Sequence, residues 1–486
     1  MTSETTTNQP CTPAEPQVTL TAGQKQALQQ ITDFLQSPGS GIFILKGYAG
    51  TGKTTLIKLL AQQLQQQQQQ FALLAPTGRA AAVIRSKSGF DANTIHGELY
   101  TFHGVDGEPD PDLTDPQPDD FGQMRLLFTM RLPEAAEYEE KVYIIDEASM
   151  VSDEPAVDTS FAEFGSGHTL SDLLHAAGTN KIIFVGDPCQ LPPVGAAYSP
   201  ALDAAYLRSR GKTVQEFELK EIVRQAEGSA VLQLAHRIRR QTQQTHFEKW
   251  IKIKARDIPA VACTSYQAQL QYYLSKLQHG QPQDVIAICH SNKECLQINR
   301  QVRRHLLGSA DAPLQEGDLL IITQNNYKVP LANGDFVLVR YVDPHIQMYC
   351  GLQFCNVTVE DLHTGQQHNA LMCLNTLYSG SPNITHQQQR SLMIAFSKKM
   401  RAQQIKPRTI RYREELQNDP YLNSLRANYG YAVTCHKSQG GEWEQVFLFL
   451  NKGMYVMPGP MLTRWWYTAV TRAKNQLVLT DDWWLV

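Results

Sequence analysis

Short apolar runs alternate along the chain with segments whose apolar residues recur at helical spacing. The runs are rich in β-branched and aromatic residues, and they cover residues 42–45, 71–75, 142–145, 181–185, 285–289, 446–450 and 476–480. Continuous apolar strands separated by helices are typical of parallel sheets that are buried on both faces. The runs fall into two groups with a gap between them. We therefore predict an α/β protein with two parallel-sheet domains.

Two segments interrupt this alternation. Residues 101–140 include the acidic, proline-rich stretch HGVDGEPDPDLTDPQPDD, which cannot continue a helix or a central strand. Residues 314–425 begin with short alternating strands and a turn signal at Asn333-Gly334-Asp335, and later become basic with a helical pattern. We interpret both as insertions, the second in part a small β module.

These observations predict the domain boundaries. We expect a disordered tail over 1–17, a first α/β domain over 18–225 with its insertion at about 101–140, a second α/β domain over 226–313 and 426–486, and an insertion over 314–425. The chain ends soon after the last motif described below, so we expect no nuclease domain.

Composition narrows the class. The formal net charge is -3, so no global basic excess indicates a nucleic-acid partner, although a local stripe would suffice. The nine cysteines form no CxxC pair, which favours reduced thiols in a cytosolic protein over disulfides or a zinc site. No apolar run approaches the roughly 18 residues of a membrane span, so we expect no membrane association.

The stretch GYAGTGKT, residues 47–54, fits the phosphate-binding pattern G-x-x-x-x-G-K-[ST] between an apolar run and a helix. Its glycines allow backbone N–H groups to surround phosphates, Lys53 would reach the β- and γ-phosphates, and Thr54 would bind Mg²⁺. The predicted nucleotide-binding residues of this loop are Gly47, Gly50, Thr51, Gly52, Lys53, Thr54 and Thr55. The sequence therefore predicts ATP and Mg²⁺ as cofactors.

Two further apolar runs end in polar residues that suit hydrolysis. In VYIIDEASMV, Asp146 would hold Mg²⁺ and Glu147 would polarise the attacking water. In IIFVGDPCQLPPVG, the neutral amide of Gln190 could sense the γ-phosphate, or it could be an ordinary turn residue.

The ordered set of motifs resembles that of superfamily 1 helicases, most closely the RecD/Dda type of superfamily 1B. The matching stretches are LTAGQKQAL, the phosphate loop, APTGRAA, TIHGEL, IIDEASMV, GDPCQLPPVG, LKEIVRQ, CHSNKECLQIN, YAVTCHKSQGGEWEQVFL and WYTAVTRAK. The resemblance implies two RecA-like P-loop domains with a small 1B insertion and an SH3-like 2B insertion, and an ATP site in the cleft between the domains.

By matching position, the resemblance assigns roles around that cleft. Gln24 would read adenine, Gly440 and Glu442 would meet the nucleotide from the second domain, and Arg224 and Arg472 would reach the γ-phosphate from opposite sides. Arg472 would be the arginine finger. The predicted catalytic residues are Lys53, Asp146, Glu147, Gln190, Arg224 and Arg472.

The resemblance also implies a single-stranded DNA track over both domains, built on backbone contacts without a base code. The matching residues are Pro76, Thr77, Arg79, Thr94, His96, Ser291, Asn292, Thr434, His436 and Lys437. His96 could instead be a satisfied core histidine. The implied partners are single-stranded DNA and duplex junctions, for a monomeric, cytoplasmic, nucleoid-associated protein.

The insertions leave alternatives open. Residues 121–132 could hold an aromatic wedge, Phe121 or Phe128, or could form a helix packed on the domain. The cations within residues 398–413 could contact DNA or form a solvated helix face, and residues 376–425 match nothing in the family. The 2B resemblance implies 5′-to-3′ movement on DNA with unwinding of duplex. The rival hypotheses are a superfamily 1 RNA helicase, a translocase that displaces proteins without unwinding, and a P-loop ATPase unrelated to nucleic acid.

Overall fold

The computed structural model describes most of the chain, with gaps at the N-terminus and within several loops. The described residues are 19–107, 117–122, 125–131, 140–155, 162–222, 230–244, 246–248, 250–258, 261–279, 281–326, 328–407, 409–481 and 483–486. The predictions for the tail over 1–17 and for Arg224 lie outside these residues.

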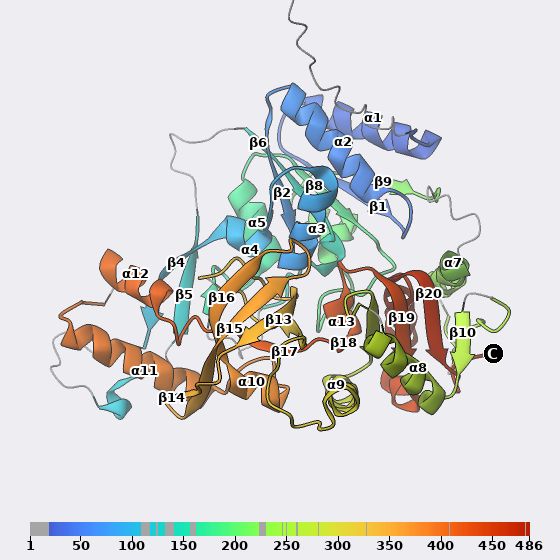
Figure 1. Ribbon diagram of the computed structural model, residues 1–486. Coiled ribbons are helices and arrows are strands. Elements are labelled where there is room, and N and C mark those ends of the chain that lie inside the picture. Colours follow the sequence, from blue (N-terminus) through green and yellow to red (C-terminus); the bar gives the residue numbers. More distant parts are fainter. Residues whose placement is uncertain are drawn as a thin grey trace, which may run out of the picture.

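The first parallel sheet has six strands in the order β3-β2-β6-β8-β1-β9. Their bounds are β1 Ile42–Gly47, β2 Gln70–Ala75, β3 Ala92–Thr94, β6 Lys141–Ile145, β8 Ile182–Gly186 and β9 Val214–Leu219. Both faces of the sheet are buried because alternate side chains of β1 enter different clusters: Ile42 and Ile44 lie in one, and Phe43 and Leu45 lie in the other. The helices around this sheet are α1 Ala22–Gln36, α2 Lys53–Gln66, α3 Gly78–Ser88, α4 Ile95–Leu99, α5 Thr169–Ala177 and α6 Ala204–Ser209 (Figure 1).

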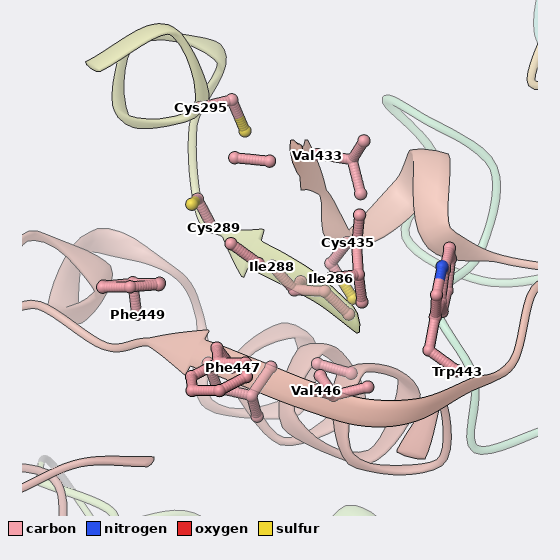
Figure 2. Packing of buried hydrophobic residues seen from close by; sticks show 14 of the residues in the cluster. Ile286, Ile288, Cys289, Cys295, Val433, Cys435, Trp443, Val446, Phe447 and Phe449 are labelled. Atoms are coloured by element: carbon pink, nitrogen blue, oxygen red, sulfur yellow. The ribbon is translucent and has the colours of Figure 1, made fainter. Parts of the chain in front are cut away.

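The second parallel sheet has five strands in the order β10-β20-β19-β11-β18. Their bounds are β10 Val261–Thr264, β11 Val285–Cys289, β18 Ala432–Thr434, β19 Trp443–Phe449 and β20 Ala473–Thr480. Figure 2 shows the centre of its core, where Ile286 and Ile288 of β11 lie beside Val446 and Phe447 of β19. The flanking helices are α7 Ala230–Thr242, α8 Tyr266–His279, α9 Asn292–Leu307, α13 Cys435–Ser438 and α14 Gly459–Val470. The predicted α/β class with two parallel sheets is confirmed.

An antiparallel sheet lies beside the second parallel sheet, in the order β14-β15-β13-β12-β17, with β16 paired to β15. Its strands are β12 Leu319–Ile322, β13 Phe336–Val342, β14 Gln347–Tyr349, β15 Leu352–Asp361, β16 Gln367–Cys373 and β17 Ala427–Tyr429. The turn predicted at Asn333-Gly334-Asp335 is present, because Gly334 has a φ of +97° and the Asp335 N–H donates to the Ala332 carbonyl. It closes a longer connection between β12 and β13 than a two-residue hairpin would.

The chain passes directly from the antiparallel sheet into the second parallel sheet. Only Gly430 and Tyr431 separate the end of β17 from the start of β18. Tyr431 donates through its hydroxyl to Asp318, next to β12, while its carbonyl accepts from Ala287 of β11. A second link is the buried pair between Arg303 of α9 and Asp318, at 3.1 Å.

A three-stranded sheet, β4-β5-β7, extends from the first domain and consists of β4 Tyr100–Asp106, β5 Arg125–Met130 and β7 Ala162–Phe164. Residues 125–130 form a strand, so the helical alternative for residues 121–132 is wrong. The wedge interpretation is also wrong in this structure, since Phe121 and Phe128 are only 3% and 7% exposed. Phe128 stacks on Phe164 with ring centroids 4.5 Å apart, which gives it a packing role instead.

The basic part of the second insertion is helical, as its pattern predicts. It contains α11 His386–Ala402 and α12 Ile410–Asn418, and the uncharged helix α10 Leu374–Ser379 precedes it. We call α11 and α12 the helical arm. Met393, Phe396 and Leu416 of the arm share a buried cluster with Phe128 of the three-stranded sheet, and the Arg390 guanidinium donates to the Phe121 carbonyl at 2.6 Å. The second insertion therefore packs on the first (Figure 1).

Among the described residues, no helix is both long enough and apolar enough to cross a bilayer.

Candidate nucleotide site and strand-binding face

The phosphate loop lies where β1 ends and α2 begins, as its motif predicts. Gly50 and Gly52 have φ values of +80° and +77°, which only glycine adopts without strain. At Gly47 an added Cβ would lie 2.8 Å from the Thr51 hydroxyl, so the tight turn also excludes a side chain. The loop residues from Gly47 to Thr55 are thus held in the geometry of a phosphate cradle.

The Lys53 ammonium lies inside this cradle. It donates to the Gly47 carbonyl at 2.8 Å and to the Tyr48 carbonyl at 3.2 Å. The ammonium that the motif assigns to phosphate oxygens therefore donates to two main-chain carbonyls in this structure. A nucleotide would replace these neutral acceptors by charged ones, which make stronger hydrogen bonds.

The acids of the second motif follow β6 directly. Burial raises the pKa of Asp146 to about 6, and the neighbouring Glu147 adds to this shift. Glu147 has a φ of +50°, an uncommon conformation for a side chain of its size and one that occurs often at functional sites. A buried carboxylate with a raised pKa is stabilised by a cation.

The donor types of Thr54 and Asp146 fit Mg²⁺. Thr54 supplies a hydroxyl and Asp146 a carboxylate, and P-loop Mg²⁺ sites take few protein ligands because phosphates and waters complete the shell. Within the described residues no group of three or more His, Cys, Asp and Glu side chains could hold a metal ion alone. Thr54 and Asp146 would therefore hold Mg²⁺ together with the nucleotide.

Gln190 connects the two walls of the cleft. With its amide oriented to satisfy both neighbours, its nitrogen donates to Glu147 at 3.3 Å and its oxygen accepts from the Arg472 guanidinium at 3.3 Å. Arg472 is further held by the carbonyls of Thr468 and Gly441. Three predicted catalytic residues thus form one continuous chain, although Glu147 and Arg472 are 325 positions apart in the sequence.

Two residues of this interface were not predicted. Tyr467 donates through its hydroxyl to Asp187 at 2.7 Å and accepts from the backbone N–H of Ala49, in the phosphate loop, at 3.0 Å. Asp187 is fully buried, and burial raises its pKa. Their signals were available, because Asp187 ends the apolar run of β8 and Tyr467 lies within WYTAVTRAK.

Gln24 is engaged differently from its predicted role. Its Nε2 donates to the Thr51 carbonyl at 3.1 Å, and its Oε1 accepts from the Thr21 N–H as part of the cap of α1. Both ends of the amide are used and the side chain is buried. In this conformation Gln24 braces the phosphate loop, so the prediction that it reads adenine would require both bonds to break.

Gly440 and Glu442 face α3. Glu442 pairs with Lys87 at 3.6 Å, and a Cβ on Gly440 would lie 3.3 Å from that of Ala80. Both residues thus lie against α3 of the first domain. Their contact with the nucleotide stays a prediction.

Several predicted strand-binding residues lie where parallel strands end, the edge at which open α/β sheets bind ligands. Thr77 caps α3 after β2, and Ser291 caps α9 after β11. Thr94 and Thr434 end β3 and β18, the neighbours of those strands. Helix N-termini at such an edge favour phosphate groups. The remaining predicted residues beside them are Pro76, His96, Asn292, His436 and Lys437.

A hollow of about 400 Å³ opens on the second domain among Asn292, Thr434 and Lys437. Burial lowers the pKa of Lys437 and that of His436. This hollow brings together predicted residues from α9, β18 and α13, which are separate in sequence.

Arg79 contacts two aromatic rings in this structure, and its contact with DNA stays a prediction. Its guanidinium carbon is 4.7 Å from the centre of the Phe336 ring and 4.3 Å from that of Trp443. Burial lowers its pKa to about 10. Arg79 therefore joins α3 to β13 and β19, and Gly78 beside it packs so closely on Ala332 that a Cβ would clash.

His96 packs within the first domain. Its ring lies 5.4 Å from that of Tyr100 and 5.0 Å from that of Phe164, and burial lowers its pKa. A neutral, packed ring is the state expected of a core histidine, and the contact of His96 with DNA stays a prediction.

Comparison with known proteins matches this arrangement. An AAA domain family model matches residues 19–256, and the model of the UvrD-like helicase C-terminal domain matches residues 429–480. Fold and site thus define the class as P-loop proteins with two parallel-sheet domains, the second similar to the UvrD-like helicase C-terminal domain. The curated relatives include the ATP-dependent RecD2 DNA helicase of Deinococcus radiodurans, 28% identical over 41% of this chain and 22% of that protein. Another is the RecBCD enzyme subunit RecD of Mycolicibacterium smegmatis, 26% identical over 61% of this chain and 54% of that subunit. The chain is thus similar to helicases of the RecD type over part of its length.

The likeness to solved structures concerns the fold. A structure of the Pif1 helicase from Bacteroides in complex with ADP-AlF3 and ssDNA has a TM-score of 0.50 and 16% identity, and the match covers 96% of this chain and 95% of that one. A Pif1 structure at forked dsDNA has a TM-score of 0.50 and 17% identity, over 96% and 93%. The chain spans 22% to 54% of the length of the curated relatives it matches.

Proposed function

We propose that this protein is an ATP-dependent DNA helicase that moves 5′ to 3′ on single-stranded DNA and unwinds duplex. The observation that carries the proposal is the chain Glu147–Gln190–Arg472, which joins groups of both parallel sheets beside the phosphate loop. A site completed by two domains hydrolyses nucleotide only when they approach, so chemistry is coupled to motion.

Each residue of the site has a distinct task in this proposal. Lys53, Thr54 and Asp146 bind Mg²⁺-ATP, and Glu147 orients and polarises the attacking water. Arg472 stabilises the charge that develops on the transferred phosphoryl group. Gln190 touches both Glu147 and Arg472, so it can report on the phosphate to each wall of the cleft. Arg224 belongs to the same proposal by its position in the family motif.

The strand would cross the carboxyl edges of both sheets. Support comes from the caps at Thr77 and Ser291, from Thr94 and Thr434 at neighbouring strand ends, and from the hollow beside Lys437. The names of the relatives, a DNA helicase and proteins solved with ssDNA or forked dsDNA, support DNA as the polymer. The 5′-to-3′ polarity, action as a monomer and a cytoplasmic, nucleoid-associated location rest on the likeness to superfamily 1B.

One observation favours a second candidate, a translocase that clears proteins from a strand without unwinding duplex. The two aromatic residues considered as a wedge, Phe121 and Phe128, are buried in the three-stranded sheet. Strand separation would then need another element to split the duplex.

The test combines ATPase and unwinding assays on the full chain. We expect poly(dT) to stimulate ATP hydrolysis, and a duplex with a 5′ tail to be unwound while its 3′-tailed counterpart is not. Stronger stimulation by poly(U) would favour the RNA helicase. Stimulation without strand release on either tail would favour the translocase, and no polynucleotide stimulation at all would overturn both.

A further inference from the structure

Three aromatic residues lie beyond the carboxyl edge of the second parallel sheet. Tyr455 belongs to the short helical turn Lys452–Val456, which follows β19, and its side chain is 58% exposed. Trp250 is 37% exposed, and its ring lies 6.0 Å from that of Tyr455 and 4.7 Å from that of Trp483, which follows β20. We call these three residues the aromatic patch. It lies at the corner of the molecule where the C-terminus is found (Figure 1).

The aromatic patch is bordered by positive charge. The Lys252 ammonium lies 4.3 Å from the centre of the Trp483 ring, and the Lys452 ammonium lies 5.7 Å from it. A carboxylate close by in the sequence, Asp481, is paired with Arg256 at 2.7 Å. Exposed aromatic groups that cluster mark interaction surfaces. Rings beside ammonium groups suit single-stranded nucleic acid, because bases stack on rings and phosphates are attracted by cations.

Hydrogen bonds connect the aromatic patch to a predicted strand-binding residue. The Glu294 Oε2 accepts from the backbone N–H of Ser291 at 3.2 Å, and its Oε1 accepts from the Asn451 side chain. The Asn451 carbonyl accepts from the Trp484 indole at 2.6 Å, directly beside Trp483. Two bridging residues thus fix the position of the patch relative to the strand-binding face.

The order of the strands gives the distance between the patch and the hollow of the second domain. Thr434 ends β18, and three inter-strand steps lead from β18 through β11 and β19 to β20. Neighbouring strands are about 4.8 Å apart, so the carboxyl ends of β18 and β20 are about 14 Å apart. Stacked nucleotides follow one another at about 3.4 Å, so roughly four of them would span this distance.

We propose that the aromatic patch extends the strand-binding face as a stacking platform for bases of single-stranded DNA, several nucleotides beyond Thr434. Tyr455 supplies the most exposed ring and Trp250 the second, while Lys252 and Lys452 attract the neighbouring phosphates. Stacking of this kind needs no cavity, since a base lies flat on an exposed ring, and it tolerates any sequence.

The position of the patch selects this occupant. An acidic protein segment would also be attracted by the two lysines, but the patch shares its edge of the sheet with Ser291 and Thr434, which belong to the predicted strand track. The inference rests on the proposed function, and it adds residues that lie outside all the motifs from which the strand track was predicted.

The first test measures the affinity of the full chain for oligo(dT) of increasing length, without ATP, by fluorescence anisotropy. For long oligonucleotides, Tyr455→Leu should weaken binding about 5- to 100-fold, the range expected when one base loses its aromatic partner. The loss should vanish for oligonucleotides too short to reach from Thr434 to the patch. Tyr455→Phe keeps the ring and is the matched control, with wild-type affinity at every length.

The second test uses tryptophan fluorescence, which a base stacked on an indole quenches. Four of the six tryptophans are at most 4% exposed, so their rings cannot stack on a base: Trp443, Trp465, Trp466 and Trp484. Long oligo(dT) should quench the fluorescence of the wild-type protein. Trp250→Phe should lose most of this quenching and keep its affinity, because the phenyl ring still stacks.

The outcomes separate this inference from the proposed function. Equal affinity of the wild type and Tyr455→Leu for long oligo(dT), in a protein whose ATPase is stimulated by poly(dT), would overturn the platform and leave the proposed function standing. A loss of the same size at every length would also overturn it, since the contact would then not lie beyond Thr434. Quenching of Trp250 by polyglutamate but not by oligo(dT) would overturn it by assigning the patch to an acidic protein segment. A protein that binds no oligo(dT) of any length would remove the basis of both proposals.

Discussion

Two of the contacts between the halves of the molecule differ in chemistry: one is polar and the other is apolar. At the nucleotide interface, Arg472 and Tyr467 of the second domain meet Gln190, Asp187 and the phosphate loop of the first through single hydrogen bonds. Several of these groups are buried and titratable. At the arm interface, apolar residues of α11 and α12 join one cluster with the three-stranded sheet.

The difference indicates a division of labour. Apolar burial is stabilising whatever is bound, at about 25 cal/mol per Å² of area removed from water. Buried carboxylates and guanidinium groups are stabilised only when their partners are correctly placed. We therefore expect the arm interface to persist through the ATPase cycle, and the nucleotide interface to respond to what occupies it.

The largest effect on the nucleotide interface should come from removing the positive charge of Lys53. Lys53→Ala should reduce turnover below detection, because Lys53 is the residue the P-loop motif assigns to the β- and γ-phosphates. Steady-state ATPase measurement checks this. Lys58→Ala, further along the same helix, serves as the control, and a Lys53→Ala protein with normal turnover would contradict the P-loop assignment.

The opposite wall should show a smaller but still large effect. Arg472→Ala should spare nucleotide binding and lower the hydrolysis rate by roughly 10³-fold or more, as for other arginine fingers. Single-turnover hydrolysis and nucleotide titration separate the two quantities. Lys474→Ala, which removes an exposed partner of Glu444, should leave both unchanged. Lost affinity with an intact rate would place Arg472 outside the transition state.

The arm interface should respond in stability rather than in chemistry. Phe396 is buried against Tyr412, with ring centroids 5.3 Å apart, so Phe396→Ala should cost about 3–5 kcal/mol of local stability. Limited proteolysis of the arm and thermal unfolding measure this, with the exposed Lys398→Ala as the control. ATP hydrolysis without DNA should stay near the wild-type rate. A large loss of that basal rate would erase the distinction between the two interfaces.

The smallest expected effect concerns the free energy of unfolding, which the buried charge of Asp146 should lower. Burial raises the folded-state pKa of Asp146 to about 6, above its ordinary 3.8, so the folded protein binds this proton more tightly than the unfolded chain does. At pH 7 without Mg²⁺, Asp146→Asn should therefore be more stable than wild type by about 1–3 kcal/mol, although we expect it to hydrolyse no ATP. The difference should shrink as the pH falls from 6 towards 4. Thermal unfolding across this range checks the sign, and equal stability at every pH would exclude the strain.

The sequence predicts the parallel sheets well because their strands need no distant information. The run Val285–Cys289 is apolar at every position, and it forms β11 over the same residues. The P-loop, Asp146 and Glu147 are similarly local, since each follows its own strand. Such features depend on a few neighbouring residues.

Features that depend on packing between distant elements could not be predicted from the sequence. Arg79 matches a strand-binding position, yet its environment is set by Phe336 and Trp443, hundreds of residues away. The helical arm could be predicted as helix, but nothing in its pattern names the three-stranded sheet as its partner. Likewise, the motif around Gln24 predicts a contact with adenine, whereas in the structure its amide donates to the Thr51 carbonyl.

The two residues between β17 and β18 have a mechanical consequence. Because only Gly430 and Tyr431 separate β17 from β18, the two sheets cannot move far relative to each other. The buried ion pair between Arg303 and Asp318 holds the same junction in place. The connection between the antiparallel sheet and the second parallel sheet is thus rigid rather than flexible. If the second parallel sheet rotates when the cleft opens or closes, the antiparallel sheet should rotate with it as one rigid body. The helical arm, which is farthest from the cleft, would then undergo the largest displacement.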